Sequence, residues 1–439
     1  MTANGGTPTL NLASYASRSA GAALRLEPAT GTGLQFAAIP TAVSNGVLSG
    51  AYFLSPSGAI DFVGTPAAIN TNVAALASVA DLSAAGAGAA NGNYLLASAY
   101  ATSGVLAANS LRLSGAAANL TLGAALTVTS ASATALGGIL HDNALGAATI
   151  AGSTITTSTA GQELFLVTGG TANANALTIA SVLANGAGGV TKAGSGLLVL
   201  TGSNSFTGAV TLDEGTLRVS GATTGLLGLP AAATVNALRP GTTLEVSSAG
   251  ASVAPYTGAT ALPTLITAVT NGSGTISVLT PGPQAIQFGG AANGTGTGVL
   301  TSVLADGAGK LSVIVKANGG VQVLAGLNTY TGATIVGSGT LAVTNLANIG
   351  QPSGLGAGDA TSAATNAASL VLLSGARLLY TGNNVQAYDN RYLNLFLETQ
   401  TASVATNRLF TMLGDAQLES EGGYGNNIQT ASANRINNN

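Results

Sequence analysis

Residues 189–219 read GVTKAGSGLLVLTGSNSFTGAVTLDEGTLRV. They align without a gap on residues 313–343, VIVKANGGVQVLAGLNTYTGATIVGSGTLAV, 124 positions further along the chain. Fourteen of the 31 aligned positions are identical. Chance identities in this chain would be mostly Ala, Gly and Thr, yet Lys192 and Asn204 also keep their register, and an aromatic–Thr–Gly triplet recurs at Phe206 and Tyr330. The two segments are therefore copies of one structural repeat, which has to be identified before the fold class.

The repeat contains three short runs of apolar and β-branched residues, at Leu197–Leu200, Val210–Leu212 and Thr216–Val219. Gly, Asn, Ser and Asp separate these runs, which is typical of strands joined by turns. One such unit cannot bury its apolar face by itself, whereas stacked copies can. The repeat therefore predicts an all-β solenoid in which each coil lies on the coil before it.

The pattern G-x-T-K-x-G-x-G-x-L-x-L-x-G-x-N-x-[FY]-T-G, followed by G-T-L-x-V, resembles the passenger-associated transport repeat of autotransporter passenger proteins. Residues 191–219 match nearly every position. Residues 317–343 match the second half well, and Val315 and Asn318 replace a Thr and a Gly of the first half. The resemblance implies a right-handed parallel β-helix that is exported across the bacterial outer membrane. It implies no catalytic residues.

The composition agrees with a stacked β structure. Charged residues are 6% of the 439 residues, and 62 residues are Gly; ordinary soluble domains carry about 25% charged residues. The mean hydropathy is +0.44, which argues against disorder. Charges stacked in every layer would repel, while Asn, Ser and Thr form hydrogen-bonded ladders. We therefore predict a right-handed parallel β-helix, or β-solenoid, as a single elongated domain.

Three regions are expected along this domain. Residues 1–112 are predicted to be a β-rich solenoid segment in which 66–90 is either helical or an Ala-rich excursion from the solenoid. Residues 113–385 form the solenoid that contains both repeats, and prolines punctuate 221–310 between them. Residues 386–439 hold degenerate turns and a frayed tail, because the last residues have little apolar content. Residues 113–141 are apolar but show alternating runs, so strands are expected there and not a membrane span.

The lone histidine is the first candidate for catalysis. His141 and Asp142 would need a Ser nucleophile presented to them, and no G-x-S-x-G motif occurs in the chain. We expect a solvated loop histidine instead. The matched Lys192 and Lys316 are predicted to mark a solvent-facing strand position and not a ligand site.

Paired carboxylates could support glycoside cleavage. Asp213 and Glu214 form one pair, but Gly337 and Ser338 replace them in the second copy, as suits a solvated corner. A second group would bring Glu419 and Glu421 together with Asp415. Because 15 acidic and 12 basic residues are spread over the whole chain, we predict no catalytic, cofactor-binding or metal-binding residues. The absence of cysteine excludes thiolate chemistry.

The expected function is that of a non-enzymatic exported passenger segment, acting as a cell-surface stalk, adhesin or surface-layer component. The alternative is a carbohydrate-active β-helix enzyme, either a polysaccharide lyase or a glycoside hydrolase. Expected partners are host or neighbouring-cell surface molecules or polysaccharide, with end-to-end self-association; a net charge of −3 gives no basis for nucleic-acid binding. The protein should be secreted or lie at the cell surface, with its export signal and outer-membrane attachment in parts outside this sequence.

Overall fold

The computed structural model describes residues 9–76, 79–86, 88–115, 117–132, 135–142, 146–159, 161–170, 175–219, 235–246, 274–278, 282–288, 297–381 and 406–420. It is almost wholly β, as predicted: its two helices, α1 (Leu82–Ala85) and α2 (Ala363–Ala368), have four and six residues. The chain divides into two compact units, 1–243 and 244–439. The sequence predicts one elongated domain instead. The division lies in the proline-punctuated stretch between the two repeats, at the first residue of β27 (Thr243–Val246).

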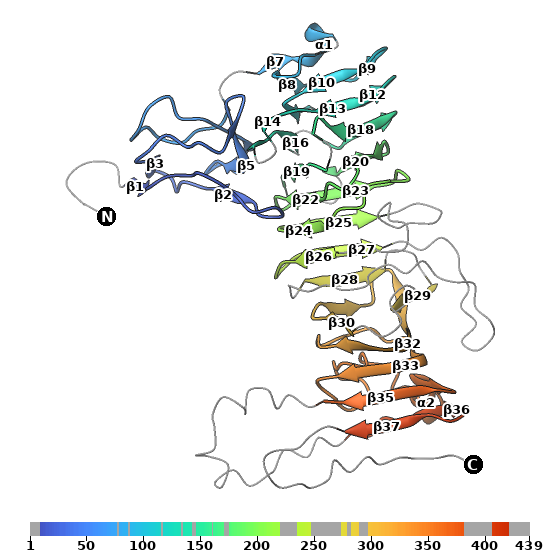
Figure 1. Ribbon diagram of the computed structural model, residues 1–439. Coiled ribbons are helices and arrows are strands. Elements are labelled where there is room, and N and C mark those ends of the chain that lie inside the picture. The colour runs from blue at the N-terminus through green and yellow to red at the C-terminus, as the bar shows by residue number, and fades with distance from the viewer. Residues whose placement is uncertain are drawn as a thin grey trace. The chain divides into compact units, whose positions relative to one another are not determined.

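In the first unit, short parallel strands stack into three sheets that form the sides of a β-helix, which we call the coil stack (Figure 1). One sheet contains β7 (Ala80–Asp81), β8 (Asn93–Leu96), β11 (Ser110–Leu113), β16 (Gly138–His141), β19 (Leu164–Thr168), β22 (Val190–Ala193), β24 (Val210–Leu212) and β26 (Val235–Leu238). The second contains β9 (Tyr100–Thr102), β12 (Leu120–Leu122), β17 (Ala148–Gly152), β20 (Leu177–Ile179), β23 (Leu197–Leu200) and β25 (Thr216–Val219). The third contains β10 (Leu106–Ala108), β13 (Leu126–Val128), β18 (Thr154–Thr157) and β21 (Val182–Leu183). The predicted parallel β-solenoid is therefore confirmed.

The parallel register places equivalent residues of successive coils above one another, so that their side chains form columns. In the first sheet Leu111 pairs with Ile139, Ile139 with Leu166, and Leu166 with Lys192. In the third sheet Leu126 pairs with Ile155, which pairs with Leu183. Because side chains alternate between the two faces of a strand, every second residue of each strand lies in the interior. The core is therefore a continuous apolar column.

The repeat motif can now be explained by its contacts. In the first copy the Asn204 Oδ1 atom accepts the backbone N–H of Leu183 at 2.9 Å, and in the second the Asn328 Oδ1 atom accepts that of Leu304 at 2.8 Å. Each side chain thus caps a backbone N–H group of a strand in the preceding coil. The aromatic residues Phe206 and Tyr330, which hold the same position in the two copies, are both fully buried.

Two glycines of the motif are required by the backbone. A Cβ atom at Gly208 or Gly332 would lie 2.3 Å or less from backbone atoms of the preceding coil, which is closer than real contacts allow. The last turn of the motif has positive φ values in both copies, 74° at Gly215 and 70° at Gly339. Glycine adopts this conformation without steric strain. The motif therefore specifies where consecutive coils approach each other and where the chain turns.

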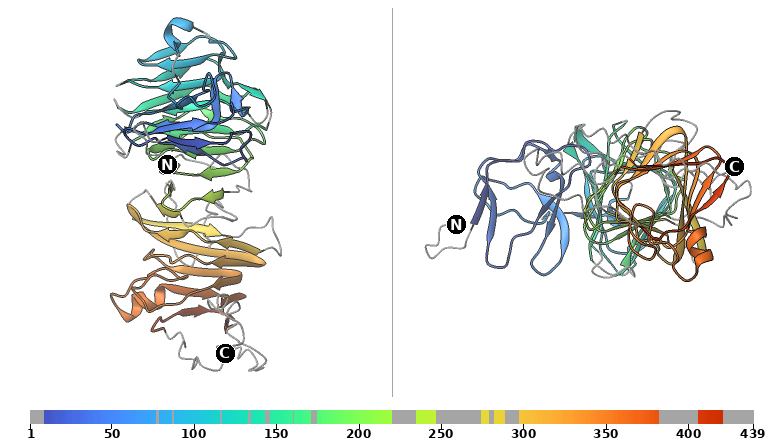
Figure 2. Two further views of the ribbon diagram at one scale, coloured as in Figure 1. Left: turned by 90° about the vertical axis from the view of Figure 1, so that its left-hand side faces the viewer. Right: turned by 90° about the horizontal axis from the view of Figure 1, so that it is seen from below.

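The N-terminal strands form a separate small sheet structure, the N-terminal lobe (residues 9–76). It contains β1 (Thr9–Leu12), β2 (Leu24–Leu26), β3 (Gly33–Phe36), β4 (Val43–Ser44), β5 (Val47–Leu54) and β6 (Ile60–Gly64). Strand β5 pairs antiparallel with β4 and β6, and parallel with β2. Antiparallel neighbours cannot be successive turns of a parallel coil, so this part of 1–112 is not a solenoid segment. It lies beside the coils (Figure 2).

The sequence allows a helix near 66–90, and in the described part of this segment α1 is the helix that forms. The backbone N–H of Val73 donates to Leu34 O, and that of Leu76 donates to Phe62 O, so this segment follows lobe strands and is extended. Helix α1 begins after Asp81, whose side chain accepts the N–H of Ser83. The hydrogen bonds of Val73 and Leu76 to lobe strands use backbone N–H groups that a helix would otherwise engage.

Strands of the lobe pack on the outward face of the coil stack. One hydrophobic cluster joins Val47, Tyr52, Ile60 and Phe62 of the lobe to Leu136, Leu140, Phe165, Val167 and Ala193 of the stack. A small antiparallel pair, β14 (Ser130–Ser132) and β15 (Ala135–Leu136), continues this contact. Its backbone donates to the lobe, from Leu136 N to Ser49 Oγ at 2.7 Å. The lobe therefore covers an apolar face of the stack that would otherwise contact water.

The second unit has the same parallel pairing with longer strands. It contains β28 (Thr275–Val278), β29 (Gly282–Phe288), β30 (Thr297–Leu300), β31 (Val303–Ala305), β32 (Gly309–Leu324), β33 (Thr334–Val343), β34 (Leu370–Leu373), β35 (Ala376–Tyr380), β36 (Thr411–Leu413) and β37 (Gln417–Ser420). Strand β33 pairs with β34 along its first half and with β35 along its second half. The predicted frayed end of the tail lies outside the described residues.

Replacement of Tyr330 by Ala should lower the free energy of unfolding of the second unit by about 3–5 kcal/mol, because a fully buried ring leaves a cavity. Replacement by Phe keeps the ring and removes only the hydrogen bond between the hydroxyl groups of Tyr330 and Thr334, 2.6 Å apart. That change should lower it by about 1 kcal/mol. Urea unfolding followed by circular dichroism measures both values. Equal unfolding curves for the wild type and Tyr330→Ala would show that the ring does not support the stack.

Candidate functional site

The prediction of a solvated loop histidine is wrong. His141 is the last residue of β16 and is 1% exposed, because its side chain lies within the first unit next to the backbone oxygen of Gly146, 3.0 Å from Nε2. Burial lowers the pKa of His141, and the charge of Asp142 opposes this shift. The Asp142 carboxylate accepts a hydrogen bond from Arg112 at 3.2 Å. No hydroxyl group is within hydrogen-bonding distance of His141 among the described residues, so they form no Ser–His–Asp arrangement.

The prediction that Lys192 faces solvent is also wrong, because its side chain points into the coil. Lys192 occupies the inner column between Leu166 and Leu212 and is fully buried. Its Nζ donates to the backbone oxygens of Gly194, of Gly196 at 2.7 Å and of Glu214 at 2.8 Å. Burial lowers its pKa to about 7, and the Glu214 charge opposes that shift. Lys192 thus holds two turns of the repeat together; for Lys316 the exposure stays a prediction.

Charged side chains of the first unit gather where the lobe meets the stack, a contact that we call the seam. Residues 1–243 contain 13 Asp, Glu, Lys and Arg residues. Ten of them lie at the seam or pair with a residue that does: Arg18, Arg25, Glu27, Asp61, Arg112, Asp142, Glu163, Asp213, Glu214 and Arg239. In a chain with so few charges, this concentration identifies the seam as the candidate functional site.

The most buried ion pair of the seam joins Arg18 of the lobe to Glu163 of the stack. Their side chains are 6% and 10% exposed, and two guanidinium nitrogens contact the carboxylate, the closer at 2.9 Å. Glu163 also accepts hydrogen bonds from the Gly21 backbone and the Thr191 hydroxyl. The Arg18 guanidinium lies 5.7 Å from the centre of the Phe165 ring. A buried ion pair with this many partners specifies one docked position of the lobe.

A second ion-pair group lies where Arg112, on the outward face of β11, contacts two carboxylates. It donates to Asp61 of the lobe and, at 3.2 Å, to Asp142 of the stack. Burial raises the pKa of Asp61 to about 6, although Arg112 opposes this shift. The single guanidinium therefore links the end of β16 to the lobe strand β6.

Asp213 and Glu214 lie on a turn after β24, as predicted, but the turn is not a solvated corner. The lobe covers it: Glu214 accepts hydrogen bonds from the Tyr52 hydroxyl and from Arg25 Nη1, the latter at 2.7 Å. Asp213 is 12% exposed and accepts from Arg239 Nε at 2.9 Å. Burial raises the pKa of Asp213, and Arg239 opposes this shift. Sequence alone could not show that a segment nearly 200 residues earlier covers this turn.

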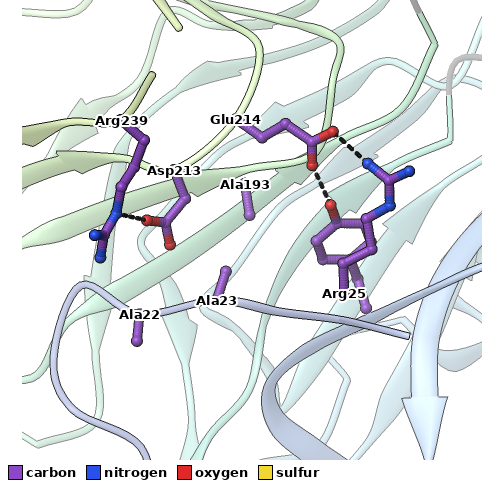
Figure 3. A pocket seen from close by; sticks show the side chains of 8 residues that line it. Ala22, Ala23, Arg25, Ala193, Asp213, Glu214 and Arg239 are labelled. Carbon is purple, nitrogen blue, oxygen red and sulfur yellow. Dashed lines mark hydrogen bonds and ion pairs between the residues drawn. The ribbon is translucent and has the colours of Figure 1, made fainter. Parts of the chain in front are cut away.

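A cavity of about 300 Å³ opens beside this turn (Figure 3). The ion pair of Asp213 with Arg239 lies on one side of it, and Glu214 with Arg25 lies on the other. Its lining comes from both parts of the unit: Ala22, Ala23, Arg25 and Tyr52 from the lobe, and Ala193, Asp213, Glu214 and Arg239 from the stack. The cavity exists only when the lobe is docked.

The acidic group considered in the tail lies only partly within the described residues. Glu419, in β37, contacts Arg377 of β35. Asp415 is exposed in the turn before β37, and Glu421 lies outside the described residues. In the described part of the chain no three His, Cys, Asp or Glu residues come together as a metal site, and no helix there is long and apolar enough to span a membrane.

Sequence reasoning missed the residues that join the lobe to the stack, namely Arg18, Asp61, Arg112 and Glu163. They belong to no motif, and the paired residues are 51 or more positions apart. One signal was available: isolated charges in a charge-poor chain need partners where they are buried, because a buried charge is costly without one. That signal predicts pairing without saying which residues pair.

Arg18→Ala and Glu163→Ala should each destabilise the docked lobe by about 3–5 kcal/mol, because each leaves the other charge buried without its partner. The double variant should be destabilised by less than the sum, which a double-mutant cycle on urea unfolding measures. Limited proteolysis should cleave the lobe first in both single variants.

The matched control is the exposed pair of Lys310 and Asp359 in the second unit, at 2.9 Å. The coupling between its two side chains should be below about 1 kcal/mol, as is usual for exposed pairs. Strictly additive effects of Arg18→Ala and Glu163→Ala would contradict the importance of the buried pair.

Comparison with known proteins supports the sequence-based resemblance. The family described as passenger-associated-transport-repeat matches residues 190–219 and 314–343. The adhesin BmaC autotransporter of Brucella suis biovar 1 (strain 1330) is 33% identical over 305 residues, which cover 69% of this chain. The chain spans 7% of that relative's length. No solved structure matches the chain.

The repeat matches coincide with the two segments in which Asn204 and Asn328 complete the ladder and Phe206 and Tyr330 fill the core. The relative is itself an autotransporter by name. The chain therefore carries two passenger-associated transport repeats and, over 69% of its length, is similar to an autotransporter adhesin.

Proposed function

We propose that this chain is a segment of an exported, non-enzymatic passenger that acts at the cell surface or in the medium as an adhesin or stalk. The observation that carries the proposal is the combination of two passenger repeats with 33% identity to an autotransporter adhesin. The parallel coils support it physically, since a solenoid presents a long surface for contact with partners. Its expected partners are surface molecules of host or neighbouring cells, or polysaccharide.

The arrangement of ionisable groups favours binding over catalysis. Hydrolysis of glycosides needs two carboxylates placed on either side of a bound sugar. Here Asp213 and Glu214 are each engaged by an arginine of the protein, and the single histidine is buried in β16. Glu214 joins the stack to the lobe, and Asp213 pairs with Arg239 within the stack. A carbohydrate-active enzyme is therefore the weaker candidate.

Beads coated with the purified chain should attach to epithelial monolayers or to bacterial cells more than beads coated with albumin or with the heat-denatured chain. Attachment counted by microscopy, with and without added cell-surface polysaccharide, measures this. A polysaccharide-cleavage screen runs in parallel. Attachment equal to that of albumin beads on all cell types would contradict the adhesin, and cleavage abolished by Asp213→Asn would replace it with an enzyme.

The second unit offers a surface for association between chains. Strands β36 and β37 each pair with one strand among the described residues, β34 and β35. Leu409, Phe410 and Leu413 expose 45%, 37% and 45% of their surfaces near these strands. A strand edge next to exposed apolar side chains is a surface on which another chain can pair.

Sedimentation velocity should therefore show concentration-dependent association of the chain, with the mean sedimentation coefficient rising severalfold between low and high micromolar protein. Phe410→Lys should weaken the association, because it places a charge on the exposed edge. Val105→Lys is the matched control, since Val105 is an exposed apolar residue of the first unit, at 59%. A single monomeric species at the highest concentration would contradict association through these strands.

A further inference from the structure

The seam cavity combines charged groups of both signs over small apolar side chains. Two guanidinium groups, of Arg25 and Arg239, face two carboxylates, of Asp213 and Glu214. The lining charges therefore sum to zero. A charged ligand would meet a like charge beside each counter-charge, whereas a neutral polar ligand meets no such repulsion and leaves both pairs intact.

Hydrogen-bonding capacity remains on the side of the Asp213–Arg239 pair. Arg239 uses only Nε on Asp213, so among the described residues its two terminal nitrogens have no acceptor. The Oδ2 atom of Asp213 is buried and makes no hydrogen bond of normal geometry in the described part of the chain, although the Ala23 backbone N–H is close enough to the carboxylate to oppose the rise of its pKa. A donor group thus lies beside an acceptor. A hydroxyl group is both donor and acceptor, and neighbouring hydroxyls can satisfy the two together.

The opposite side of the cavity is held rigid. Glu214 accepts hydrogen bonds from Tyr52 and Arg25, and Arg25 is in turn held by Glu27. Between the two charged sides lies Ala193, facing Ala23 of the lobe (Figure 3), and Ala22 also contributes to the lining. These methyl groups offer an apolar surface on which the C–H face of a ring can rest. Sites with an apolar floor and a few fixed polar groups are typical of small-ligand binding.

From this geometry we propose that the seam cavity binds a neutral, polyhydroxylated ligand, one sugar unit of a surface polysaccharide. This inference rests on the proposed adhesin function and names the class of ligand that one site of the adhesin binds. The volume, about 300 Å³, is at the lower limit for small-ligand sites and suits one sugar unit with its neighbours outside. Because both the lobe and the stack line the cavity, binding requires the docked lobe.

The test is an array of neutral gluco-, manno- and galacto-oligosaccharides, printed beside sialylated and sulfated ones and probed with the fluorescently labelled chain. Isothermal titration then measures the affinity of the best neutral oligosaccharide. We expect at least one neutral series to bind. Asp213→Asn and Arg239→Ala should each weaken that binding at least tenfold, while Asp359→Ala, which removes an exposed carboxylate of the second unit, should leave it unchanged.

A further variant separates ligand contact from docking of the lobe. Ala22→Leu fills the cavity without touching either ion pair, so it should abolish saccharide binding while limited proteolysis still shows a docked lobe. Three results would overturn the site. They are the absence of binding to any neutral oligosaccharide, an affinity equal to that of the wild type in both Asp213→Asn and Ala22→Leu, and binding of charged glycans alone. If coated beads still attach to cells in those cases, the adhesin proposal stands and only the cavity fails; if attachment is also absent, both fail.

Discussion

Parallel backbone pairing between successive coils is the constraint on which the rest of this structure depends. It places each residue directly on its counterpart in the next coil, so that one position in the sequence becomes a column in space. The inner columns accept apolar side chains such as Leu166 and Leu212 because each coil shields the next from water. They accept Lys192 only because backbone oxygens at two turns surround its ammonium group.

The same constraint explains why this chain has so few charges and where they lie. A charge repeated in register along a stack would repel its copies, so the repeating positions hold small, apolar or neutral polar residues. Charges are tolerated where the structure does not repeat, and the seam is such a place. There the pairs Arg18–Glu163 and Arg112–Asp61 join a lobe of mixed strands to the outward face of the parallel sheet.

Docking of the lobe also creates the cavity that is the best candidate for ligand binding. Neither part has it alone, since Arg25 and Tyr52 come from one side and Asp213 and Arg239 from the other. A site built at the contact of two parts can be changed by altering their contacts while the coils stay as they are. The stack then acts as a scaffold, and function lies in what is attached to its flank.

The sequence by itself determined the β-solenoid, the positions of the two repeats and the turns at Gly208 and Gly215, because all of these follow from local pattern and from recurrence at a fixed spacing. It also indicated that Phe206 and Tyr330 hold equivalent positions. Only the tertiary structure decided that Lys192 points inward, that His141 is buried and that Asp213 and Glu214 lie beneath a lobe. The reason is physical: the side of a strand that faces the core depends on register with its neighbours, and the partner of a charge depends on which distant segments the fold brings together. Neither is recorded in the spacing of residues along the chain.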